Sequence, residues 1–162
     1  MAIIQFQGEF YHAAIALMAA VQDHEHQLCP ELVPIGSAVA EAHLNYLIRH
    51  CQQNNGAIYL AIDGIQALAL ISVYLDEEDA DAQHIYPEYK RYGYVADLVV
   101  ADTHRRQGLA QRLMLQAEQH CKTLGLTTIK VSSLACNTSA SDFYQAIGYK
   151  PAEQLFTKAL TQ

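Results

Sequence analysis

Apolar residues recur along this chain at two spacings, and the two spacings predict two kinds of element. Three- and four-residue spacing predicts helices, which we place at residues 9–21, 37–53, 109–124 and 138–147. Alternating or continuous apolar runs predict strands, which we place at residues 2–7, 56–62, 65–75, 94–100, 127–133, 149–150 and 154–160. The expected order is therefore β-α-α-β-β-β-α-β-α-β-β.

This order predicts the fold class. Asp63-Gly64 lies between two strand-like runs and is a strong β-hairpin signal, so neighbouring strands are expected to be antiparallel. We expect an α/β (α+β) fold with a central, mostly antiparallel mixed sheet. The chain has 162 residues and shows no internal repeat or linker, which predicts a single domain over residues 1–162.

Composition and charge narrow the function classes. Hydrophobic residues make up 51% of the chain and charged residues 17%, which is typical of a globular protein. The net charge of −7 argues against broad nucleic-acid binding. No apolar run reaches the roughly 20 residues that span a bilayer, and the N-terminus lacks a signal-peptide pattern, so we expect a cytoplasmic protein without membrane partners.

No metal site is predicted. His24 and His26 form a His-x-His pair, but no third ligand lies at a suggestive spacing, and a solvated helix end explains the pair better. The four cysteines include no CxxC pair.

The clearest candidate chemistry lies between residues 94 and 115. An apolar strand is followed by the polar run 102–107, then by Gly108, and Leu109 begins a helix. The first amides of a helix lack intrahelical acceptors and lie at its positive end, so they suit phosphate. Gly108 has no Cβ to keep an anion away, and Arg105 and Arg106 add positive charge.

Residues 105–110 (RRQGLA) fit the Arg/Gln-x-x-Gly-x-Gly/Ala signature, and the chain here resembles the GNAT family of N-acetyltransferases. Asn137, Phe143-Tyr144 and Gly148-Tyr149 follow in the order that this family shows. The resemblance covers about residues 94–150 and implies a GNAT-like fold that uses acetyl-CoA as cosubstrate. It implies that these residues contact acetyl-CoA: Leu98, Val99, Val100, Arg105, Arg106, Gln107, Gly108, Leu109, Ala110, Gln111, Asn137 and Tyr144.

The resemblance also implies a reaction, which is direct transfer of an acetyl group to a primary amine. A backbone N–H near Val99 would polarise the thioester carbonyl. Tyr144 would be the general acid, because a phenol with a pKa of about 10 stays protonated at neutral pH. Asn137 would bind the pantetheine arm or order its loop.

The general base is left open by the sequence. Many family members carry Glu where this chain has Ala96. Asp97 is a candidate, although a regular strand would direct it to the other face and give it a structural partner instead. Glu88 or a chain of water molecules could replace it as the base. A covalent route through an acetylated Cys136 is an alternative to direct transfer.

Two other functions remain compatible with the sequence. One is a non-catalytic GNAT-fold module that senses CoA, and the other is an acyltransferase acting on aminoacyl-tRNA, which the net charge disfavours. The expected acceptor is a small-molecule amine or a basic peptide, attracted by the acidic segment 76–92 and its tyrosines Tyr86, Tyr89 and Tyr92. The competing interpretation of this segment is a solvated loop, and a homodimer is compatible with the sequence.

Overall fold

A computed structural model describes residues 1–160, which divide into two compact units. The first unit, residues 1–132, contains the whole sheet and three of the α-helices. The second unit begins at Ser133 and contains one α-helix.

The first unit is built on a sheet of five strands in the order β1-β2-β3-β4-β5. The first three neighbouring pairs are antiparallel and the last, β4 with β5, is parallel, which confirms the predicted mostly antiparallel mixed sheet. Gly64 has φ +57° between β2 and β3, so the predicted hairpin is formed. The bounds are β1 Ala2–Gln5, β2 Ala57–Asp63, β3 Gln66–Glu77, β4 Arg91–Val100 and β5 Ile129–Val131.

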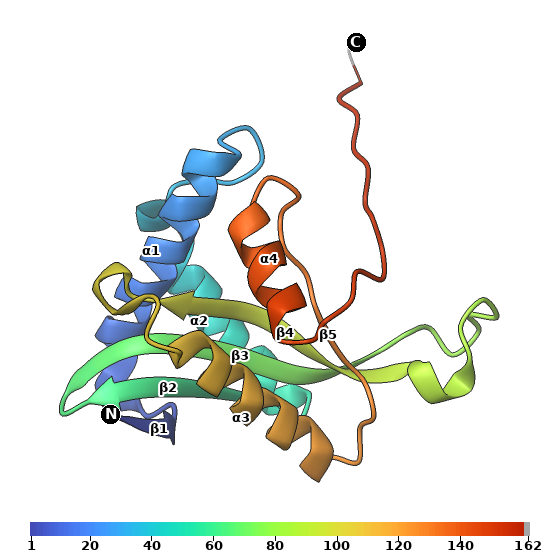
Figure 1. The fold of residues 1–162 in the computed structure, drawn as a ribbon, viewed down its shortest axis with the longest axis horizontal. Helices are drawn as coiled ribbons and strands as arrows, with labels where there is room; N and C mark the ends of the chain where they lie inside the picture. Colours follow the sequence, from blue (N-terminus) through green and yellow to red (C-terminus); the bar gives the residue numbers. More distant parts are fainter. Residues whose placement is uncertain (161–162) are drawn as a thin grey trace. The chain divides into compact units, whose positions relative to one another are not determined.

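Helices cover both faces of this sheet (Figure 1). Two of them, α1 (Tyr11–Leu28) and α2 (Gly36–Gln53), pack on one face, and α3 (Leu109–Thr123) packs on the other. Short 3₁₀ turns, η1 Gly8–Phe10, η2 Pro87–Tyr89 and η3 Asp102–His104, lie in the connections.

The long strand β3 supplies side chains to both layers because its residues alternate between faces. Leu70 and Tyr74 join the core against α1 and α2, which includes Leu44 and Leu47. Its intervening residues, such as Ile71, are fully buried as well. A strand buried on both faces reads as a continuous apolar run, which is the pattern that predicted it.

Two helix boundaries differ from the prediction. The first helix continues through His24 and His26 to Leu28, because the polar side chains of this segment do not break it. The second begins at Gly36, whose N–H donates to Asp23 Oδ1 at 2.6 Å, so a side chain of α1 satisfies this helix start.

In the second unit, α4 (Thr138–Ala146) confirms the predicted helix. Asn137 caps it, since its Oδ1 accepts a hydrogen bond from the N–H of Ala140 at 3.2 Å. Gly148 follows the helix with φ +99°, a left-handed conformation that favours glycine.

The two final strands of the predicted order are wrong for the described residues. Residues 149–160 form neither helix nor strand, and Leu155, Phe156 and Leu160 are 85–90% exposed. Alternating side chains make a segment suitable for a sheet, but a strand also needs a neighbour to pair its backbone groups. The sequence pattern cannot supply that neighbour.

Candidate active site

The sheet opens between β4 and β5. These strands pair only from Gly93–Ile129 to Val95–Val131, whereas β4 continues beside β3 as far as Val100. From Ala96 onward, the edge of β4 that faces away from β3 has no strand partner within the described residues. Backbone groups on that edge are therefore available to a ligand.

The register shows which backbone groups point into this opening. Ala101 donates its N–H to the carbonyl of Leu68 at 2.8 Å, and hydrogen-bonded positions alternate along an antiparallel pair. Val99 therefore bonds to β3, while the N–H groups of Leu98 and Val100 point toward the open edge. The N–H groups that are available for the predicted role near Val99 are therefore those of its two neighbours.

A β-bulge at Ala96 changes the direction of Asp97. Ser72 is paired with Asp97 and Val73 with Val95, so Ala96 is an extra residue in β4. The prediction that Asp97 follows the alternation of a regular strand is therefore wrong. The N–H of Asp97 donates a hydrogen bond to Ser72 Oγ at 3.1 Å, and the side chain of Asp97 lies on the face that α1 and α2 cover.

On that face Asp97 meets a histidine that the sequence did not single out. His43 of α2 places Nε2 3.0 Å from Asp97 Oδ2. The pKa of His43 is raised, first because of this hydrogen bond, while burial opposes the increase. The only sequence signal was position: His43 lies one residue from the buried stripe of Ala40, Leu44 and Leu47.

Glu25 of α1 adds a second carboxyl group to this cluster. Its pKa is raised by burial and by the negative charge of Asp97, and the charge of His43 partly opposes the increase. Two carboxyl groups and one imidazole from α1, α2 and β4 therefore interact electrostatically beside the opening of the sheet.

The predicted phosphate loop has the geometry of an anion site. Gly108 is the N-cap of α3 with φ +77°, and a Cβ placed there would meet no atom within 4 Å. Arg112 is the first residue of this helix whose N–H donates a backbone hydrogen bond, and its acceptor is the carbonyl of Gly108 at 3.0 Å. The amides of residues 109–111 have no side-chain cap.

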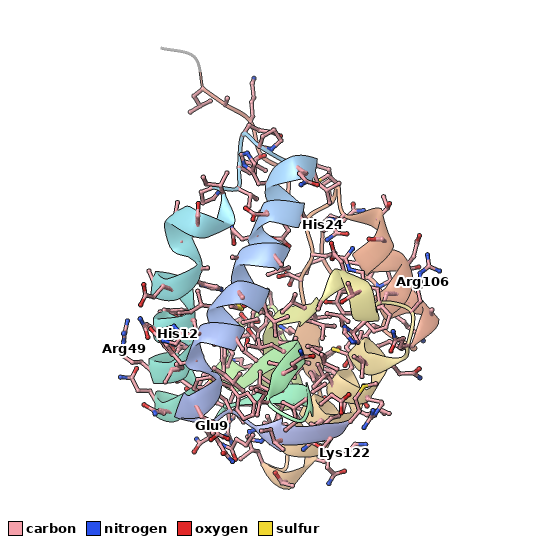
Figure 2. The ribbon with its side chains drawn as sticks, turned by 90° about the vertical axis from the view of Figure 1, so that its left-hand side faces the viewer. Glu9, His12, His24, Arg49, Arg106 and Lys122 are labelled. Atoms are coloured by element: carbon pink, nitrogen blue, oxygen red, sulfur yellow. The ribbon has the colours of Figure 1, made fainter. Side chains whose placement is uncertain are left out.

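The two arginines of this loop differ in their surroundings. Arg105 is 2.7 Å from Asp102, so a neighbouring carboxylate offsets its charge. Arg106 is exposed, has φ +63° and forms no ion pair within the described residues. Figure 2 shows Arg106 at the surface of the molecule, where its charge is accessible.

The acidic segment lies at the other end of β4 from this loop (Figure 1). It enters the strand at Arg91, and ten residues of strand separate the two ends by about 30 Å. Lys130 is 2.8 Å from Glu78 and covers the ring of Tyr92 at 3.7 Å, and Tyr92 is buried. The prediction that Tyr92 offers its face to a substrate ammonium group is therefore wrong.

The second unit contains the predicted acid. Tyr144 lies on α4, with its ring centroid 5.4 Å from that of Phe143 and 6.1 Å from that of Tyr149. Asn137 uses its Oδ1 for the helix cap and accepts a further hydrogen bond from Ser139 Oγ at 3.0 Å.

No group of three or more potential metal ligands occurs within the described residues. His26 Nδ1 is 2.6 Å from the carbonyl of Val33, while His24 lies near the end of α1 (Figure 2). In the same residues, no helix is both long enough and apolar enough to cross a membrane.

Known proteins show the same sequence pattern and fold. The model of the acetyltransferase (GNAT) family matches residues 21–149. A GCN5-related N-acetyltransferase 6, chloroplastic, from Arabidopsis thaliana is 36% identical over 63 residues, 39% of this chain. The matched stretch spans only 22% of that relative.

Solved structures agree over nearly the whole chain. A tetramutant of the BH1408 protein from Bacillus halodurans superposes with a TM-score of 0.83 at 15% identity, covering 99% of this chain and 100% of that one. An aminoglycoside 6′-N-acetyltransferase from Acinetobacter haemolyticus gives 0.65 at 18% identity, with coverages of 100% and 99%. An aminoglycoside N-acetyltransferase in complex with CoA gives 0.70 at 15% identity, with coverages of 98% and 93%.

Proposed function

Since the chain belongs to the GNAT family of acetyltransferases, we propose that it moves the acetyl group of acetyl-CoA to a primary amine. One observation carries this proposal. Ala96–Val100, the open half of β4, pairs only with β3. It is followed by a helix whose first amides are uncapped and whose N-cap leaves room for an anion. Acetyl-CoA carries its thioester and its pyrophosphate at opposite ends of the pantetheine arm, and these two features suit those two groups.

The residues present fit acetyl-CoA. The amides of residues 109–111 and the exposed charge of Arg106 suit a pyrophosphate. The N–H groups of Leu98 and Val100 can bond to the pantetheine arm and to the thioester carbonyl, as an added strand would. A carbonyl held by such a donor is more electrophilic, because the donor stabilises the negative charge that develops on oxygen.

We assign the role of general acid to Tyr144. The leaving thiolate needs a proton, and a phenol of ordinary pKa near 10 holds one at neutral pH. This assignment rests on the Phe143-Tyr144 pair and its place in the GNAT pattern. Asn137 orders the start of the same helix and is assigned to the pantetheine side for the same reason.

The acceptor is proposed to be a small cationic amine or a basic peptide. Two structural neighbours are aminoglycoside N-acetyltransferases, so aminoglycosides belong among the amines to be tested. Polyamines, amino acids and peptides with a free N-terminus or lysine complete the panel. We propose a homodimer as the assembly, which sedimentation of the purified chain would check.

The function is tested by thiol release from acetyl-CoA over this amine panel. We expect at least one amine to give turnover, and Tyr144→Phe to lower kcat by about 10²–10⁴ while the Kd for acetyl-CoA moves little. Binding of acetyl-CoA without thiol release from any amine would favour the sensing module. Acetylation of aminoacyl-tRNA alone would favour the tRNA acyltransferase.

A further inference from the structure

His43 and Asp97 form a polar contact between α2 and the sheet beside the opening of β4, and the reaction above gives this pair no role. We propose that His43 accepts a proton from the amine substrate and that Asp97 positions its imidazole ring. This inference rests on the proposed acetyl transfer and supplies the general base that Ala96 cannot provide.

The location fits this role. Asp97 is two residues beyond Val95, where β5 leaves β4. It immediately precedes Leu98, whose N–H points to the open edge where the thioester carbonyl is proposed to bind. Adjacent strand residues are about 3.3 Å apart along the strand, so the residue that holds His43 is the neighbour of the residue whose N–H is proposed to bind the thioester carbonyl.

The geometry of the pair assigns the protons on His43. A carboxylate only accepts hydrogen bonds, so Nε2 carries the hydrogen that points to Asp97 Oδ2, 3.0 Å away. The lone pair is therefore on Nδ1, which makes no hydrogen bond within the described residues. The side chain of His43 is 37% exposed and that of Asp97 is 15% exposed, so the base is accessible while its partner is sheltered.

The surroundings hold the ring and favour a cationic substrate. The ring of Tyr46, one turn along α2, is stacked on that of His43 with centroids 6.2 Å apart. The charged and titratable groups that face His43 are Asp97 from β4, Glu25 from α1 and Tyr46 from its own helix. Two carboxyl groups near the imidazole attract an ammonium ion and stabilise the imidazolium that proton transfer creates.

The proton balance is complete. One proton of the substrate ammonium passes to His43 Nδ1 and then to solvent, which leaves a neutral amine. Its nitrogen attacks the thioester carbonyl, the C–N bond forms and the C–S bond breaks. The second amine proton is lost as the sulfur gains one, so the products are the amide, the CoA thiol and one released proton.

The test compares His43→Gln, Asp97→Asn and the wild type by pH profiles of thiol release, using the best amine from the panel. We expect kcat of His43→Gln to fall by about 10²–10⁴, with loss of the wild-type ionisation on the acidic limb. In Asp97→Asn that limb should move to lower pH, because the hydrogen bond to the carboxylate raises the pKa of His43. The titration of the His43 ring by NMR should show the same decrease in pKa.

A matched control is available on the same helix. His50 is also partly buried and contacts the rings of Tyr46 and Tyr74 at 5.1 and 4.3 Å, but it has no carboxylate partner within the described residues. His50→Gln should retain the wild-type profile. Circular dichroism and the Kd for acetyl-CoA, unchanged within about twofold, should show that each variant folds and binds.

Two results would overturn the inference and leave acetyl transfer intact. The first is a His43→Gln variant with kcat within about twofold of wild type, which would make the pair a structural link between α2 and β4. The second is an acidic limb that does not move in Asp97→Asn, which would assign the ionisation to the amine itself. A wild-type chain that binds no acetyl-CoA and releases no thiol would instead refute the proposed function, and this inference with it.

Discussion

The two halves of β4 have the same apolar character in sequence but different surroundings in the fold. Arg91–Val95 is paired on both edges, with β3 on one side and β5 on the other over Gly93–Val95. Ala96–Val100 is paired only with β3 and contains the bulge and Asp97. The first half, which we call the closed half, stabilises the sheet. The second is the open half, and it exposes backbone donors beside the pair formed by His43 and Asp97.

This difference separates stability from function along one strand. In the closed half, backbone groups are hydrogen-bonded and side chains are packed, so substitutions should change the free energy of unfolding. In the open half and the loop that follows it, some backbone N–H groups have no acceptor in the protein. Substitutions there should change the Kd for acetyl-CoA or the kcat.

The largest effect should come from the loop after the open half. Gly108→Asp would place a carboxylate where the pyrophosphate is proposed to bind, and like charges at a binding site cost several kcal/mol. We expect the Kd for acetyl-CoA, measured by calorimetry, to rise by at least about a hundredfold.

Gly108→Asn is the matched control because it has nearly the same shape without the charge, and asparagine tolerates positive φ. It should weaken binding much less than Gly108→Asp. Equal affinity in wild type and Gly108→Asp would contradict the assignment of this loop.

A smaller effect, of a different kind, should come from the closed half. A Cβ at Gly93 would collide with Cys121 Sγ and lie 3.3 Å from Cys121 Cβ. Gly93→Ala should therefore lower the free energy of unfolding by about 1–3 kcal/mol, measured by urea titration.

Gly93→Ala should bind acetyl-CoA with nearly wild-type affinity at a temperature where it is folded. Adding Cys121→Ala should restore part of the lost stability, because it removes the sulfur from the collision. A stable Gly93→Ala chain with weakened acetyl-CoA binding would reverse the roles assigned to the two halves.

Features that depend on neighbouring residues were predictable from the sequence. The Asp63-Gly64 hairpin and the helix that begins after Gly108 are both local signals, and the structure confirms them. The loop at residues 105–111 was found in the same way, because its chemistry follows from a strand, a glycine and a helix start.

Features that depend on distant partners were not predictable. His43 meets Asp97 across 54 positions of sequence, and the direction of Asp97 depends on a bulge that appears only when β4 is aligned with β3. The predicted strand at residues 154–160 failed for a related reason, since side-chain alternation does not show whether a pairing edge exists.

The central claim, that the open half of β4 and the start of α3 bind acetyl-CoA, is tested most directly by amide hydrogen exchange with and without saturating acetyl-CoA. Residue-resolved NMR is required because the claim concerns single N–H groups. We predict slower exchange at Leu98, at Val100 and at residues 109–111, with little change over Arg91–Val95. Saturated binding that leaves Leu98, Val100 and residues 109–111 unchanged would contradict the account.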